Sequence, residues 1–243
     1  MEQALLYGII SGFGLVIGST TGLFFKFRQT TIAKIMAFGS GVLICALTFG
    51  LMTSAFDHGG FDAVIVGFLS GGLIFILGDY LIHKAGGRRH KKHQHIKTEQ
   101  ITNGQAIVVG AILDGIPESV ALGIAIFSGK GLGVLMLCAI FLSNFPEGIS
   151  SVSGLLKEGY KRKSIIFMWF VVAVVCTFIT IISYSYFNQL DINIIGVIEA
   201  FAAGAMLAML ADAMMPEAFE EGGSSIGLLT VLGFITAFII SKI

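Results

Sequence analysis

The sequence predicts an all-α polytopic membrane protein, an eight-transmembrane-helix bundle that forms a single transmembrane domain over residues 1–243. Of the 243 residues, 55% are hydrophobic and only 12% are charged. Eight apolar runs have about the 20 residues that a helix needs to cross a bilayer. Because such helices pack against one another in lipid, we expect one bundle rather than separate domains.

The expected spans follow one another with short connections. They cover residues 4–25, 35–56, 63–82, 106–127, 132–156, 164–184, 193–215 and 226–240. The first run has no basic segment ahead of it and is longer than a signal-peptide core, so we expect it to remain as a helix. Glycines at helical spacing in the first and third runs favour close packing of helix backbones. The fourth and fifth runs contain a proline, Pro216 directly follows the seventh, and the sixth carries no carboxylate.

Basic residues indicate the orientation. Thirteen of the fifteen follow the first, third or fifth span, and only Lys130 and Lys242 fall on the other side. Cytoplasmic loops are enriched in Lys and Arg, so these loops are expected in the cytoplasm and both termini outside. We therefore expect a multi-pass protein of the plasma or inner membrane, with the lipid bilayer as a partner and no nucleic acid.

The segment 84–103 is predicted to be a flexible cytoplasmic loop, since it is densely charged and has few apolar residues. It contains His90, His93 and His95. Short His-rich tracts bind metal ions, so these histidines either bind a transition metal in the cytoplasm or are incidental to a basic tether.

Every proline in the chain is followed by a glutamate, and each pair lies inside or at the end of an apolar run. The pairs are Pro117-Glu118, Pro146-Glu147 and Pro216-Glu217. A carboxylate at the centre of a bilayer costs at least about 2.5 kcal/mol, so it normally faces a polar cavity. Proline also frees the carbonyl four residues earlier. This concentration of oxygen predicts a membrane transport site.

Two of these helices should share one cavity. Asp114 and Glu118 are four residues apart and lie on one face of a helix, as do Ser143, Asn144 and Glu147 on the next. Three carboxylates so close repel one another unless protons or a cation compensate them. With no Lys or Arg near the middle of any span, a divalent cation is favoured, and a proton relay, alone or together with metal transport, is the alternative.

The segments 114–119 (Asp-Gly-Ile-Pro-Glu-Ser) and 143–148 (Ser-Asn-Phe-Pro-Glu-Gly) resemble the paired His-Asn-x-Pro-Glu-Gly-type motifs of ZIP (Zrt-/Irt-like) divalent-metal transporters. The resemblance covers nearly the whole chain and includes the segment from Ala202 to Glu217. It implies a bundle with internal pseudo-symmetric repeats, frequently a homodimer, that moves Zn, Fe or Mn toward the cytoplasm by sliding of helix groups. The metal is then a substrate, no cofactor is expected, and the chain is not an enzyme.

The resemblance also assigns ligands. Glu118 and Glu147 match the family's glutamate ligands, Asp114 stands where a histidine is usual, and Ser143 and Asn144 stand at ligand positions of the fifth helix. Gly115 replaces an asparagine, which argues against a second metal position. Cys176 falls near the position of a sixth-helix ligand; if it binds, thiolate favours Zn, and otherwise an oxygen shell favours Mn or Fe.

Further acidic residues suggest a route. Asp212 and Glu217 are expected to lead the ion toward the cytoplasm. Outside, Asp57, His58 and Asp62 either attract cations or are ordinary loop residues, and Glu199 and Asp79 are candidates for lining the path. Two other functions fit the carboxylates: a metal sensor without translocation, and an intramembrane metal-dependent hydrolase. The absence of an HExxH segment and of a nucleophile-elbow pattern argues against the hydrolase.

Overall fold

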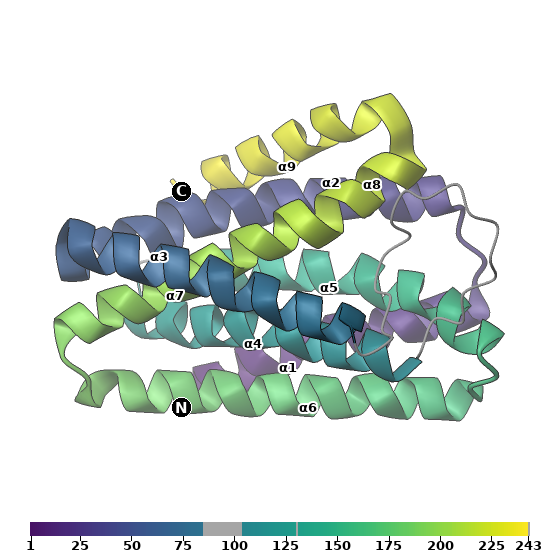
Figure 1. Ribbon diagram of the computed structural model, residues 1–243, viewed down its shortest axis with the longest axis horizontal. Helices are drawn as coiled ribbons and strands as arrows, with labels where there is room; N and C mark the ends of the chain where they lie inside the picture. The colour runs from purple at the N-terminus through teal and green to yellow at the C-terminus, as the bar shows by residue number, and fades with distance from the viewer. Residues whose placement is uncertain (85–103, 130, 243) are drawn as a thin grey trace.

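The computed structural model describes residues 1–84, 104–129 and 131–242, which form helices and turns but no strand. The elements are α1 (Glu2–Phe24), α2 (Gln29–Cys45), η1 (Ala46–Met52), α3 (Thr53–Lys84), α4 (Gly104–Ser128), α5 (Leu132–Lys157), α6 (Arg162–Tyr186), η2 (Phe187–Gln189), α7 (Ile192–Met209), η3 (Leu210–Met214), α8 (Met215–Gly222), η4 (Gly223–Ser225) and α9 (Ile226–Ile240). Figure 1 shows the long helices running side by side in one bundle.

Within these residues, six helical segments are long and apolar enough to cross a membrane. Two of them, Gln29–Ile82 and Ile192–Ile240, have 54 and 49 residues, more than twice the length that one crossing requires. Each is interrupted at a glycine with a positive φ, 63° at Gly60 and 68° at Gly223, a conformation that other residues adopt only with strain. The all-helical class is confirmed, whereas eight crossings remain a prediction.

Two helices widen into a π-helical turn. The turn η1 continues α2 into α3, and η3 joins α7 to α8. Pro216 stands at the start of α8, directly after η3. Because proline has no N–H to donate to the carbonyl four residues earlier, the regular ladder is broken here, and π turns commonly occur at such interruptions and at functional sites. The helix that begins at Ile192 thus passes through the π turn η3 and continues as α8 beyond the predicted limit of the span 193–215.

The helices pack in two sets. In the first, α1 packs against α5 and α6, and α4 packs against both α5 and α6. In the second, α3 lies along α7 and α2 along α9, as Figure 1 shows. The sets meet where α2 contacts α5 and where α4 contacts α7. The two Pro-Glu helices, α4 and α5, thus belong to the first set and lie at its border with the second.

Glycine permits the closest of these approaches. A Cβ on Gly18 of α1 would collide with the Phe145 carbonyl of α5. A Cβ on Gly204 of α7 would collide with the Phe68 carbonyl of α3. These contacts are the close backbone packing that the glycine spacing predicts.

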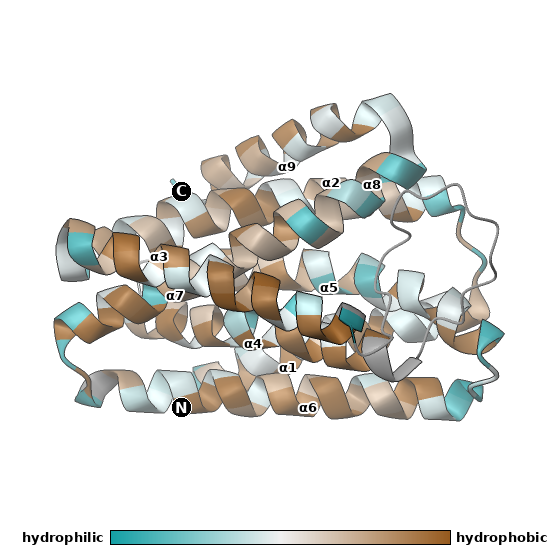
Figure 2. Ribbon diagram, in the orientation of Figure 1, coloured by the Kyte–Doolittle hydropathy of each residue, from teal (hydrophilic) through white to brown (hydrophobic). Residues whose placement is uncertain are grey.

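The outer surface is apolar. Large hydrophobic side chains are more than half exposed on α3 and α6, among them Phe61, Leu69, Phe167 and Phe178. Figure 2 shows hydrophobic colour along most of α6, with hydrophilic colour at its ends. In water such a surface would aggregate, whereas in a bilayer it faces lipid chains.

Candidate metal site

Prolines lie inside both helices that carry the predicted ligands, Pro117 in α4 and Pro146 in α5. Pro146 has no N–H to offer the carbonyl of Leu142. That oxygen lies against α2, where a Cβ on Gly39 would come within 2.8 Å of it. A glycine on the neighbouring helix thus leaves room for the carbonyl that proline frees.

The acidic side chains of α4 are among the few buried polar groups of the described chain. Asp114 and Glu118 are each 2% exposed. Ser143 of α5, also buried, donates its hydroxyl hydrogen bond to Glu118 Oε1 at 3.2 Å and shares it with the carbonyl of Ile140. The structure thus brings two of the predicted residues, Glu118 of α4 and Ser143 of α5, into direct contact. Glu147, one turn farther along α5, is half-buried.

Cys176 of α6 faces the same place. Its thiol is hydrogen-bonded with Ser119 and lies within electrostatic range of Glu118 and Glu147. A Cβ on Gly115 would lie 2.6 Å from Cys176 Sγ, so the sulfur occupies the space that a side chain at position 115 would fill. The two departures from the expected motif, Gly115 and Cys176, are therefore complementary in space.

Asn144 is held from the other side. Its amide nitrogen donates to the carbonyl of Ser11 in α1 at 3.2 Å, and the side chain is 5% exposed. The hydrogen bond uses the amide nitrogen, which cannot bind a metal. The amide oxygen, which can, therefore remains available as a ligand.

The side chains are neighbours without forming a complete cluster. Among the described residues, no group of three or more His, Cys, Asp or Glu side chains is gathered closely enough to hold a metal ion. The arrangement supplies carboxylate, hydroxyl and thiol groups on three helices, α4, α5 and α6.

On the α8 side, Glu217 accepts a hydrogen bond from Ser150 of α5 at 2.6 Å. Ser150 lies one helical turn beyond Glu147, so Glu217 continues the polar track from the central residues. Asp212, in the π turn η3, is exposed. His90, His93 and His95 lie outside the described residues.

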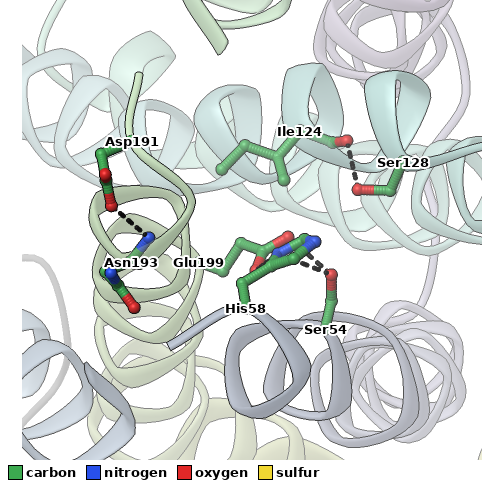
Figure 3. Close-up of polar contacts among 7 residues, drawn as sticks. All are labelled: Ser54, His58, Ile124, Ser128, Asp191, Asn193 and Glu199. Atoms are coloured by element: carbon green, nitrogen blue, oxygen red, sulfur yellow. Dashed lines mark hydrogen bonds and ion pairs between the residues drawn. The ribbon is translucent and has the colours of Figure 1, made fainter. Parts of the chain in front are cut away.

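One polar cluster was not anticipated as a unit. Glu199 of α7 is fully buried and accepts hydrogen bonds from two side chains of α3, Ser54 and His58. In the sequence, His58 and Glu199 are single polar residues within apolar surroundings. They are 141 positions apart, and no motif connects them. Figure 3 shows the three side chains converging, with Ile124 and Ser128 of α4 opposite.

The chain was compared with known proteins. A family model described as ZIP zinc transporter matches residues 81–241, a range that includes all three Pro-Glu pairs. A protein of Arabidopsis thaliana named "Putative zinc transporter" is 25% identical over 195 residues. The alignment covers 76% of this chain and 30% of that protein, so the chain spans less than a third of its relative's length.

Proposed function

Because the chain belongs to the ZIP zinc transporter family, we propose that it is a multi-pass membrane transporter. It moves divalent transition-metal ions toward the cytoplasm through a carboxylate-rich site between α4 and α5. The observation that carries this proposal is the contact of buried Glu118 with Ser143, together with Asp114 one turn away. Burying two carboxylates in a membrane protein is costly, and such groups commonly mark the path of an ion or a proton.

In this site Glu118 and Glu147 are the central ligands, and Asp114, Ser143 and Asn144 complete the shell. Metal binding displaces protons from carboxylic acids, so the same groups would exchange protons with the transported ion. A divalent cation relieves the repulsion among the carboxylates, and its release restores that repulsion.

Zinc is the metal that the neighbourhood of Cys176 favours over manganese or iron. The thiol lies within electrostatic range of both central glutamates. Thiolate is a soft ligand that selects Zn over Mn, whereas a site of carboxylate and hydroxyl groups alone would suit Mn. The complementary positions of Gly115 and Cys176 support a ligand set in which sulfur replaces the ligands usual at these two positions.

The exit is proposed along α8. The hydrogen bond between Ser150 and Glu217 supports a path from Glu147 to Glu217, with Asp212 as a second acidic group near the joint. The distribution of basic residues supports placing this end in the cytoplasm and both termini outside. A homodimer in the plasma or inner membrane is part of the same proposal and rests on the family resemblance.

Uptake into proteoliposomes tests the function. Purified wild type, Glu118→Ala and Glu147→Ala are reconstituted around a metal-sensitive dye and exposed to Zn, Mn, Fe or Cd. Glu2→Ala is the matched control, because Glu2 is an exposed carboxylate on α1 and not on the proposed exit helix. We expect Zn and Cd uptake by the wild type and the control, and none by the other two variants, with all four proteins equally monodisperse.

Two results would overturn the proposal. Uptake by both glutamate variants at wild-type rates would show that transport does not require the site between α4 and α5. Tight Zn binding by the wild type with no uptake of any metal would identify a sensor instead of a transporter.

A further inference from the structure

The cluster of Ser54, His58 and Glu199 lies apart from the central residues, between α3 and α7. Glu199 is 0% exposed, and each of its two carboxylate oxygens has a hydrogen-bond partner. Ser54 donates to Oε1 at 2.7 Å, and His58 Nδ1 lies 2.8 Å from Oε2. The imidazole is partly open, with 28% of its side chain exposed. One end of the cluster is thus accessible and the other is sealed in the protein.

The same carboxylate lines a small pocket between the two sets of helices. Its walls come from η1 and α3 on one side and from the end of α4 and the start of α5 on the other. Apart from Glu199, Ser54 and Ser128, the lining residues are apolar, among them Leu51, Ile124 and Leu132. Buried acidic groups in apolar pockets are costly, and such groups commonly mark the path of an ion. Asp57 also lies within electrostatic range of Glu199 and adds negative charge.

One pair of donor atoms has the spacing of two ligands of one ion, because His58 Nδ1 and Ser54 Oγ are 3.5 Å apart. Each is also hydrogen-bonded to an oxygen of Glu199, at 2.7 Å for Ser54 and 2.8 Å for His58, so an ion would replace these two hydrogen bonds and both donors would draw back from the carboxylate. Two ligands of a four-coordinate zinc ion lie about 3.3–3.6 Å from each other when each is about 2.0–2.2 Å from the metal. We propose that Ser54, His58 and Glu199 form a second cation-binding site, which binds a divalent transition metal such as Zn²⁺ and loads it toward the central residues.

The donor chemistry sets the class of ion and the strength of binding. Imidazole with carboxylate suits Zn and related transition metals better than Ca or Mg. Only His58 and Glu199 are strong ligands, so water must complete the shell and binding should be weak. A site on a transport path has to release its ion, and weak binding serves that purpose. The role of this site in loading the central residues rests on the proposed function, whereas the binding of Zn²⁺ to Ser54, His58 and Glu199 does not.

A structural alternative is that the cluster merely fastens α3 to α7. His58→Gln separates the two readings, because the glutamine amide can still donate to Glu199 but is a poor ligand for Zn. Asp191→Asn is the matched control. Asp191 is an exposed carboxylate at the N-terminal cap of α7, where it accepts a hydrogen bond from the backbone N–H of Asn193. An asparagine side chain can accept the same bond.

Binding is measured in full-length protein whose central ligands and other histidines are replaced. The background carries Asp114→Asn, Glu118→Gln, Glu147→Gln and Cys176→Ser, and glutamine at the four other histidines, which are His83, His90, His93 and His95. Zn²⁺ binding is titrated at equilibrium, and the visible absorption of Co²⁺ reports tetrahedral coordination. We expect one ion per chain, with an affinity that falls more than about tenfold in His58→Gln and is unchanged in Asp191→Asn.

Each outcome decides the matter. Failure of the background protein to bind Zn²⁺, or equal affinity with His58→Gln, would overturn the second site. If His58→Gln does not fold, His58→Asn provides the same comparison, because its amide can also donate a hydrogen bond and is also a poor ligand for Zn. In uptake by otherwise wild-type protein, His58→Gln should raise KM for Zn more than it lowers kcat, and an unchanged KM would overturn the loading role. Transport by Glu118→Ala and Glu147→Ala would refute the central site but not this one, since binding here is measured without it.

Discussion

The contact between Gly115 and Cys176 permits a quantitative test of the candidate site. In Gly115→Ala the added carbon would lie 2.6 Å from Cys176 Sγ, where ordinary contact begins at 3.4 Å. The sulfur must therefore retreat by about 0.8 Å or rotate away, and overpacking of this kind costs about 1–3 kcal/mol. Alanine also has a higher helix propensity than glycine, which offsets part of the cost.

A double-mutant cycle separates the two effects. Unfolding free energies in mixed micelles are compared for Gly115→Ala in the wild type and in Cys176→Ala. Helix propensity contributes equally in both backgrounds, so the difference between them measures the clash alone. We expect Gly115→Ala to be less favourable by about 1–3 kcal/mol when the thiol is present.

The same variant should alter metal preference. Because the displaced thiol no longer faces Glu118 and Glu147, Gly115→Ala should lower the ratio of Zn to Mn uptake. Equal effects of Gly115→Ala on stability in both backgrounds would refute the contact between Gly115 and Cys176.

Two further predictions concern packing and the exit path. Gly204→Ala should lower the unfolding temperature, because the added Cβ collides with the Phe68 carbonyl of α3. Gly227→Ala should leave it unchanged, since nothing lies within 4 Å of a Cβ at that position. Equal unfolding temperatures of the two variants would contradict the close contact between α3 and α7. Ser150→Ala should slow Zn uptake without changing Zn binding at equilibrium, because it removes the hydrogen bond to Glu217, which lies beyond the central residues. Unchanged uptake would contradict the proposal that the ion passes Glu217.

Most of the helix positions follow from the sequence because length and hydropathy are local properties. The last helix covers Ile226–Ile240 as predicted, and α5 ends within one residue of its predicted limit. The joints were missed for a different reason. Near Pro216 the backbone widens into a π turn before continuing as α8, and hydropathy, which is the same on both sides of the joint, cannot reveal this.

The site was only partly predictable. Helical spacing places Asp114 with Glu118 and Ser143 with Glu147, and the contact between Glu118 and Ser143 joins the two faces as expected. Contacts between distant segments carry no such local pattern. The bond from Asn144 to Ser11 and the cluster around Glu199 join residues more than 130 positions apart, and they depend on how the helix sets pack.

The most direct test of the central claim is the initial rate of Zn uptake into proteoliposomes by Glu118→Gln. Glutamine keeps the size of the side chain and an oxygen that can accept from Ser143, but it removes the negative charge. We predict loss of uptake, to less than about one-tenth of the wild-type rate, with unchanged folding. Uptake at the wild-type rate would show that the metal does not pass through the site between α4 and α5.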